Sequence, residues 1–294
     1  MKEIQTSLAG ISVFWRARPA DYDLLCKNLR EGGFTNVKVE RKSEREALRN
    51  ALKTIYKERR RVFLRPLGTG VVGYSVVYES VNEDGKRLSH DPDLYVYIDQ
   101  TTGVPILEGK RFENMSAENQ LNVQSWIASE FSKQRKYVSG TKITALLAKY
   151  LDQLNGTPLP NGGGGLYWLN HDRIEEWTRL ALCVEQSSLS KEPGREICIY
   201  SIRANMDDPG ALRAVVDGLT NNVNNRINNI KTEVISDEVG SRRLKTLGRD
   251  ASNLRDRVQE YENVLGVTLT DLRKLASTAA RTAASAAMQS MGGN

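Results

Sequence analysis

The stretch from Gly73 to Glu108, GYSVVYESVNEDGKRLSHDPDLYVYIDQTTGVPILE, decides the fold class. Its segments GYSVVYESV, LYVYID and VPILE are rich in Val, Ile and Tyr, which favour β-strands. The segments NEDGK and DQTTG between them contain the residues of tight turns. Strands joined by such short turns pair with one another, so the stretch predicts an antiparallel sheet.

Helices are predicted before and after this stretch of sequence. One begins at Ser43, where Glu46 three residues later completes a capping-box pattern, and another runs from about Ser116 to Tyr137. The preceding residues predict a strand in GISVFWRAR, a helix that begins with Pro19 and Asp21 and ends near Gly33, and a short strand in NVKVE. RVFLRPL predicts a further strand of the sheet. We therefore expect an α+β domain over residues 1–138.

The next segment, 139–205, alternates helices and strands around the glycine run PLPNGGGGLYWLN. A phosphate-binding loop needs a strand before it and Gly-Lys-Ser or Gly-Lys-Thr at its end, and this run has neither. One interpretation is a hinge that lets Tyr167 and Trp168 enter a core. The other is the turn of a winged helix, in which Lys142 and Lys149 would lie on the helix presented to DNA.

The final segment, 206–294, is predicted to be helical. Apolar residues recur every three or four positions from Leu212 to Val234, and a strict heptad pattern runs from Leu244 to Leu265. We expect an antiparallel, coiled-coil-like hairpin whose apolar stripes face each other or a partner. The Ala-rich tail either frays or, through small residues at Ala276, Ala280, Ala284 and Met288, lets another helix approach closely.

The positive charge of the chain is concentrated near its beginning. The formal net charge is +6, and residues 1–138 have 23 Lys and Arg against 18 Asp and Glu, whereas the other two segments are close to neutral. Arg41 to Arg65 alone contains ten basic and three acidic residues. Such a local excess attracts nucleic acid, an acidic protein or an anionic membrane.

The predicted helix from Ser43 has a basic side and an apolar side. At about 100° per residue, an arc of about 120° contains Lys42, Arg45, Arg49, Lys53, Lys57 and Arg60, and the opposite side contains Leu48, Ala51, Leu52 and Ile55. The absence of Trp and Phe from the apolar side disfavours a membrane. Charges about 5 to 6 Å apart along the axis predict contacts with phosphates without sequence readout, and the alternative is a solvated face. The predicted nucleic-acid-binding residues here are Lys42, Arg45, Arg49, Lys53, Lys57, Arg59, Arg60, Arg61 and Arg65.

A second candidate site has the outline of the PD…ExK pattern of nucleases. Asp93 follows Pro92, and Glu108 and Lys110 follow the next turn. If DQTTG closes a hairpin, Tyr95 pairs near Leu107, and the hairpin brings Asp93, Glu108 and Lys110 together. Two carboxylates there could hold Mg²⁺ while the lysine orients a water molecule. The pattern is short, however, and charged residues are common at the ends of hairpins.

Other classes of site find little support. The three cysteines form no CxxC pair, and two histidines are too few for a usual zinc site, so we expect no metal and no cofactor apart from Mg²⁺ in the nuclease interpretation. No apolar run is long enough to cross a bilayer, and the first residues lack the apolar core of a signal peptide. We expect a cytoplasmic protein.

The block from SGTKITALLAKYL through GGGGLYWLNHDRIEEW, followed by helices containing YENVLG, resembles uncharacterised proteins of phages and plasmids. The resemblance covers about half of the chain and implies a mobile genetic element as the setting, without functional residues to transfer. From the residues themselves we expect non-catalytic, sequence-nonspecific binding of DNA or RNA. The alternatives are a protein-interaction factor or homo-oligomer acting through residues 206–294, and a Mg²⁺-dependent nuclease.

Overall fold

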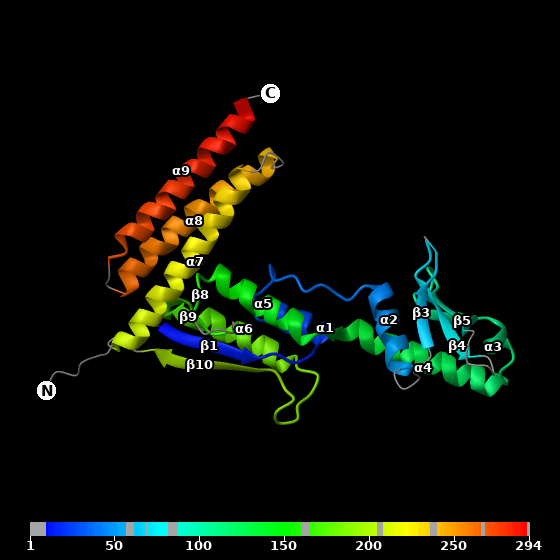
Figure 1. The fold of residues 1–294 in the computed structure, drawn as a ribbon. Helices are drawn as coiled ribbons and strands as arrows, with labels where there is room; N and C mark the ends of the chain where they lie inside the picture. The colour runs from blue at the N-terminus through cyan, green and yellow to red at the C-terminus, as the bar shows by residue number, and fades with distance from the viewer. Residues whose placement is uncertain are drawn as a thin grey trace. The chain divides into compact units, whose positions relative to one another are not determined.

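The structure, a computed structural model, describes residues 10–56, 62–68, 70–81, 88–159, 165–204, 208–235, 240–265 and 268–292. The fold is mixed α+β, with antiparallel sheets and long C-terminal helices, as expected (Figure 1). The chain forms two compact units, and each combines separate stretches of sequence. Unit 1 comprises Met1–Ala17, Thr144–Glu185 and Ile197–Asn294, and unit 2 comprises Arg18–Ile143 and Gln186–Glu196.

Unit 2 is built on the predicted antiparallel sheet. Its strands are β3 (Val62–Pro66), β4 (Gly73–Val81), β5 (Leu88–Ile98) and β6 (Pro105–Glu108), and they lie in the order β3-β4-β5-β6. The turn between β5 and β6 is closed by Asp99, whose backbone N–H donates to the Val104 carbonyl over 3.0 Å. The strand that begins with Pro105 lies at the edge of the sheet, where a missing N–H costs no ladder bond.

Two helices, α2 (Glu44–Ile55) and α4 (Ala117–Lys136), pack on one face of this sheet. The predicted apolar side of α2 is buried, and so are Ile127 and Phe131 of α4. Ser116 caps α4 by accepting from the Asn119 N–H over 3.4 Å. The core between these helices and the sheet includes the alternate residues Leu94, Val96 and Ile98 of β5, together with buried residues of β4 and β6.

The remaining elements of unit 2 are short. They are β2 (Ala20–Asp21), α1 (Tyr22–Glu31), the single turn α3 (Lys110–Glu113) and β7 (Tyr137–Val138), which pairs with β2. Asp21 caps α1 by accepting from the Leu24 N–H over 2.9 Å, as its position in the sequence predicts. The predicted strand NVKVE is wrong: residues 36–40 are irregular, because strand propensity needs a neighbouring strand to pair with.

Unit 1 contains a second antiparallel sheet in the order β10-β1-β9-β8. Its strands are β1 (Gly10–Arg16), β8 (Thr157–Pro158), β9 (Tyr167–Asn170) and β10 (Cys198–Ala204), so the opening strand pairs with residues far along the chain. A side chain at Gly10 would lie 2.3 Å from the Leu169 carbonyl and 2.6 Å from the Trp168 ring, so only glycine fits there. The helices beside this sheet are α5 (Gly140–Gln153), which begins in unit 2, and α6 (Ile174–Gln186), preceded by the 3-10 turn η1 (His171–Arg173).

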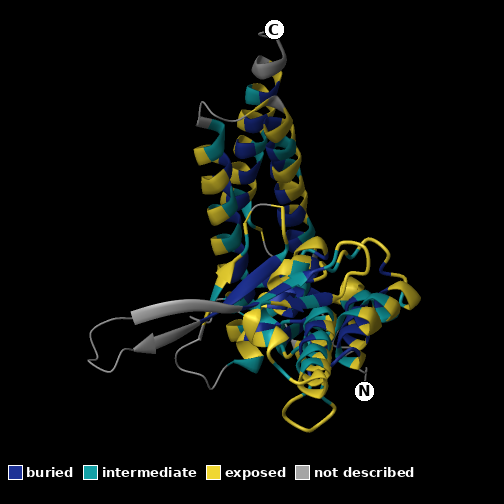
Figure 2. Cartoon of the chain, turned by 90° about the vertical axis from the view of Figure 1, so that its right-hand side faces the viewer, coloured by how far each residue is buried: buried dark blue, intermediate teal, exposed yellow. Residues whose placement is uncertain are grey.

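The last three helices, α7 (Pro209–Ile235), α8 (Ser241–Leu265) and α9 (Thr270–Gly292), pack as a bundle whose buried residues face its interior (Figure 2). The heptad residues of α8 from Leu244 to Leu265 are all buried, which confirms the predicted seam. The tail is a packed third helix. Its buried stripe is Ala276, Ala279, Ala283 and Ala287, and Ala280 is partly buried against the same core. Ala284 and Met288 are exposed, so the predicted stripe was wrong at these two residues.

A buried polar network joins the end of α5 to α8 within unit 1. The Arg257 guanidinium is 3% exposed and lies 3.1 Å from an Asp152 carboxylate oxygen. The hydroxyl of Tyr261 donates to the Asn155 carbonyl over 2.7 Å, and burial raises the pKa of Tyr261 to about 12. The network satisfies the backbone carbonyls of Asn155 and Gly156, which follow α5.

Replacing Ala283 with Leu tests which side of α9 faces the bundle. Ala283 is fully buried, so the larger side chain must overfill the interior, and we expect the free energy of unfolding to fall by about 1 to 3 kcal/mol. Ala284→Leu is the matched control, because the neighbouring residue is exposed and its change should stay within about 0.5 kcal/mol. Urea denaturation measures both. A larger loss for Ala284→Leu would contradict the observed packing.

Candidate nucleic-acid interface

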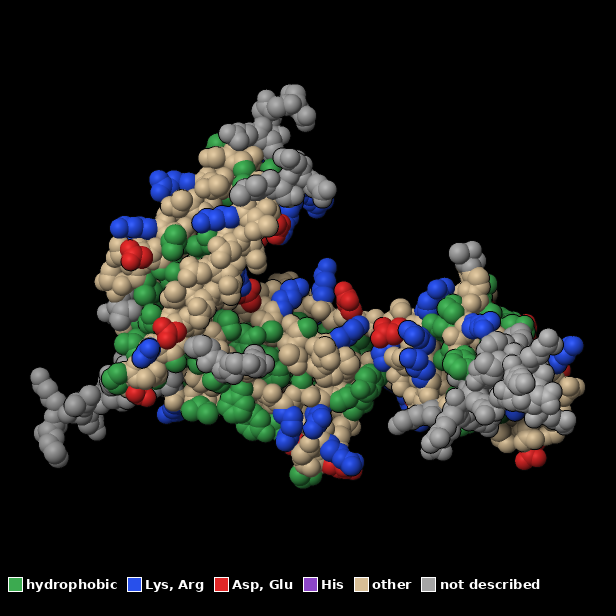
Figure 3. All heavy atoms as spheres, viewed as in Figure 1, with side chains coloured by type: hydrophobic (Ala, Val, Ile, Leu, Met, Phe, Trp, Pro, Cys, Tyr) green, Lys and Arg blue, Asp and Glu red, His purple; other side chains and the backbone are tan. Residues whose placement is uncertain are grey.

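The basic side of α2 is exposed because the opposite side is buried against the sheet. Ser43 accepts from the Glu46 N–H over 3.2 Å and so begins the helix at the predicted residue. Arg45, Arg49 and Lys53 then lie on the solvent side, and Figure 3 shows Lys and Arg side chains over this part of unit 2. The sequence prediction of a basic exposed side is therefore confirmed for these three residues.

Arg65 is the fourth exposed cation of this set. It lies on β3 and points away from the core, since its neighbour Leu64 packs against the core. Arg45 donates to the Val71 carbonyl over 3.3 Å, which holds it beside the loop between β3 and β4. Within the described ranges, none of Arg45, Arg49, Lys53 and Arg65 has a carboxylate within 4.0 Å, so their charge is available to a ligand.

Lys42 does not belong to the exposed set, and its prediction as a contact residue was wrong. Its side chain is only 6% exposed, and its ammonium donates to the Gln134 side-chain oxygen over 3.1 Å. The ammonium also lies 4.5 Å from the centre of the Tyr137 ring. Burial lowers the pKa of Lys42 by more than the nearby charge of Glu46 raises it, and the charge of Lys142 lowers it further. Lys42 lies before the first residue of α2, so its side chain does not follow the 100° spacing of the helix that placed it on the basic side.

The sequence prediction overlooked two features of this surface. Glu46 is exposed and falls between Lys53 and the apolar side in the helical projection, so it reduces the charge of the stripe. Arg135, from α4, donates to the Lys42 carbonyl over 2.6 Å and lies 3.7 Å from a Glu44 carboxylate oxygen. Arg135 therefore holds the segment before α2 in place, a role that depends on a residue more than ninety positions away.

The structure describes only two of the remaining cations that were predicted to bind nucleic acid. Lys57, Arg59, Arg60 and Arg61 lie outside the described residues. On α5, Lys142 is half-buried and Lys149 is exposed. The strand after the glycine run, β9, lies between β8 and β1 with Trp168 and Leu169 buried, which agrees with the hinge interpretation of that run. The glycines themselves, up to residue 164, are outside the described ranges.

The nuclease candidates come from neighbouring strands. Glu108 pairs with Tyr95, one residue from the predicted register, and accepts a hydrogen bond from the Tyr97 hydroxyl. Asp93 sits at the register shift between β4 and β5, and its side chain lies outside the described part. Lys110 is exposed at the start of α3. Among the described residues, no group of three His, Cys, Asp or Glu side chains is arranged to hold a metal ion.

The outer face of the unit 2 sheet carries a groove that the sequence prediction missed. The groove has a volume of about 670 Å³ and lies over the β5–β6 hairpin and the loop between β3 and β4. Tyr95 and Tyr97 line it, because in β5 they alternate with the buried Leu94, Val96 and Ile98. The signal was present in the alternation LYVYI. The other lining residues are Leu67, Val71, Ile98, Asp99, Gln100, Ile106 and Glu108.

Hydrogen bonds fix the polar groups of this groove. The Tyr97 hydroxyl bonds to Glu108, and this bond, more than any other influence, raises the pKa of Tyr97. The Asp99 carboxylate accepts from the Thr101 N–H over 2.8 Å and from the Thr102 hydroxyl over 3.0 Å. Those bonds to its charged form lower the pKa of Asp99. The groove is therefore an aromatic surface with fixed hydrogen-bond acceptors beside it.

The sequence matches a family of unknown function, DUF6744, over residues 20–291, and the chain belongs to this family. No curated protein and no solved structure matches it. Among the described residues, none of the helices combines the length and the apolar character that crossing a membrane requires. The family assignment supports the resemblance to uncharacterised proteins and adds no functional residue.

Lys42→Met tests the structural role of this buried lysine. Its folded pKa is below the ordinary value of 10.5, so between the lowered pKa and 10.5 the unfolded chain binds more protons than the folded one. The free energy of unfolding should therefore rise with pH across that interval. Lys42→Met should lack the part of this rise that comes from Lys42, because methionine does not titrate. Denaturation from pH 8 to about 10.5 measures the effect. The exposed Lys53→Met should keep the rise; equal slopes in all three proteins would contradict the burial of Lys42.

Proposed function

We propose that this protein binds nucleic acid through unit 2, with α2 and Arg65 contacting backbone phosphates. The observation that carries the proposal is the exposure of Arg45, Arg49, Lys53 and Arg65 without a nearby carboxylate in the described structure. Cations that have no carboxylate to give up lose little on meeting a phosphate, and they release counterions from the nucleic acid. Such contacts carry no sequence information, so the binding is sequence-nonspecific.

The setting in this proposal is the cytoplasm of a cell that carries a phage or another mobile element. The resemblance to phage and plasmid proteins supports that setting. The chemistry of the interface does not distinguish DNA from RNA by itself, because both present the same phosphates.

A protein partner or homo-oligomer acting through residues 206–294 is the alternative, and fewer observations favour it. The apolar stripes of α7 and α8 are buried within the bundle, so they do not require a partner to cover them. Leu275 and Met288 of α9 are exposed, at 43% and 70%, and two separated apolar residues are ordinary for a surface. A Mg²⁺-dependent nuclease that uses Asp93, Glu108 and Lys110 is the third proposal.

Reversing the charge of α2 tests the proposed function. The triple variant Arg45→Glu, Arg49→Glu, Lys53→Glu should bind a DNA duplex or RNA at least about tenfold more weakly at low salt. The slope of log K against log salt should become shallower by about 2.7, which corresponds to three lost phosphate contacts. Fluorescence anisotropy over a salt titration measures both quantities, and circular dichroism checks the fold.

The matched control is Arg242→Glu, Lys245→Glu, Arg249→Glu, an exposed basic series on α8 with similar spacing and the same change in net charge. This control should keep the wild-type salt slope. Absence of binding by the wild-type protein at low salt would refute the proposal, and loss of binding in the α8 variant alone would relocate the interface. Repeating the assay with Mg²⁺ tests the third proposal, since cleavage that Asp93→Ala abolishes would establish it.

A further inference from the structure

The outer face of the unit 2 sheet has an ordered pattern of side chains across its four strands. Residues directly opposite one another in an antiparallel sheet project from the same face. The register places Arg65, Ser75, Tyr95 and Glu108 in one row, from β3 through β4 and β5 to β6. The neighbouring row contains Gly73, Tyr97 and Ile106. A cation therefore lies at one end of the first row and a carboxylate at the other, with Ser75 and the Tyr95 ring between them.

Two residues of β4 that point to this outer face are small. At Gly73 a β-carbon would lie 2.6 Å from that of Tyr97 and 2.7 Å from a Leu67 methyl group, so the missing side chain lets Leu67 and Tyr97 approach each other. Ser75, the next outward residue, is also small. Tyr95 and Tyr97 are both partly exposed and line the groove beside these small residues. The face thus presents aromatic side chains beside a hollow instead of a flat polar surface.

One hydrogen-bonding group on this face is unused. Ser75 is 6% exposed, and its hydroxyl has no hydrogen-bond partner within the described part of the chain. A buried hydroxyl without a partner costs about 1 to 3 kcal/mol, so a ligand or water that bonds to it is favoured.

The charges around the groove fit a ligand that is anionic on one side and polar on the other. Arg65 lies in the row of Tyr95, and Arg45 bonds to the carbonyl of Val71, which lines the groove. Asp99, Gln100 and Glu108 line the opposite part, where carboxylates would repel phosphates. Carboxylates do accept hydrogen bonds from the amino groups of bases. A nucleotide chain with phosphates toward the arginines and bases toward the tyrosines satisfies both sides.

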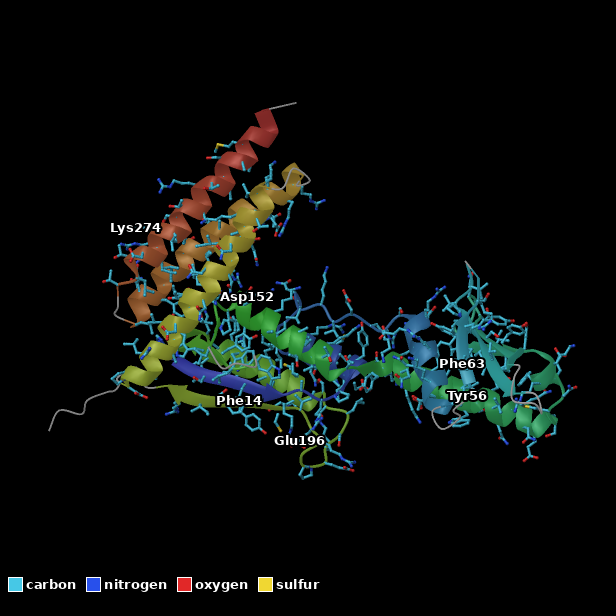
Figure 4. All side chains as sticks on the ribbon, viewed as in Figure 1. Phe14, Tyr56, Phe63, Asp152, Glu196 and Lys274 are labelled. Atoms are coloured by element: carbon cyan, nitrogen blue, oxygen red, sulfur yellow. The ribbon has the colours of Figure 1, made fainter. Side chains whose placement is uncertain are left out.

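We infer that this face binds single-stranded nucleic acid, with bases stacked on Tyr95 and Tyr97 and phosphates held by Arg65 and Arg45. The inference rests on the proposed function and adds the class of ligand. Stacking needs unpaired bases, because the faces of paired bases are covered by their neighbours in a duplex. The groove volume of about 670 Å³ is in the range of pockets that enclose small organic groups. Phe63, labelled in Figure 4, belongs to the same face and is 47% exposed.

The test compares single-stranded and duplex oligonucleotides of about 15 nucleotides, in DNA and RNA forms, by anisotropy at constant salt. We expect the single strands to bind more tightly. Tyr97→Ala should weaken single-strand binding roughly 5- to 150-fold, the equivalent of one lost stack, and leave duplex binding unchanged. Tyr97→Phe keeps the ring and should keep most of the affinity. Tyr200→Ala, a change of a 40% exposed strand tyrosine in unit 1, is the matched control and should bind as wild type.

Photo-crosslinking of 5-iodouracil oligonucleotides to the wild-type protein provides a second measurement that does not depend on the folding of a variant. Crosslinks at Tyr95 or Tyr97, mapped by mass spectrometry, support the inference. Equal affinity for single strands and duplexes, with the tyrosine variants unchanged and crosslinks confined to α2, would overturn the inference and leave the proposed function intact. Absence of binding to every oligonucleotide at low salt would overturn both.

Discussion

The contact between one face of the unit 2 sheet and the helices α2 and α4 determines where every candidate functional residue of that unit points. Burial of Leu48 and Leu52 turns Arg49 and Lys53 toward solvent, because they lie on the other side of the same helix. Burial of Leu94 and Val96 turns Tyr95 to the opposite face of the sheet. One hydrophobic contact therefore leaves a basic helix side and an aromatic sheet face available to ligands.

In unit 1, aromatic side chains on both faces of the sheet pack against other residues of the same unit. On one face of its sheet Trp168 packs against Tyr261 of the bundle, with ring centres 5.2 Å apart. On the other face Trp15 stacks on Tyr167, with ring centres 5.4 Å apart, and lies near Trp177 of α6. The heptad residues of α8 are buried by α7 and α9 in the same unit. From the sequence alone, the apolar stripe of α8 could pack against a partner or within the chain. In the structure it packs against the other helices of unit 1.

Local patterns were predicted well because their causes are local. The Val, Ile and Tyr runs formed β3 to β6, and Ser43, Ser116 and Asp21 capped the helices that follow them. The errors share another cause. NVKVE had strand composition but no partner strand, and Lys42 was projected onto a helix that begins after it. In both cases the outcome depended on residues distant in the sequence, such as Gln134 beneath Lys42.

The sequence by itself determined β3 to β6, the capped helices, the heptad seam and the exposed cations of α2, because hydrophobic periodicity and capping act over a few residues. Only the tertiary structure decided that Gly10–Arg16 pairs with Cys198–Ala204 and that Lys42 is buried. It also aligned Arg65, Ser75, Tyr95 and Glu108 in one row. Strand register and helix docking depend on contacts between residues far apart in the chain, and a pattern within one segment does not specify which distant segment will cover it.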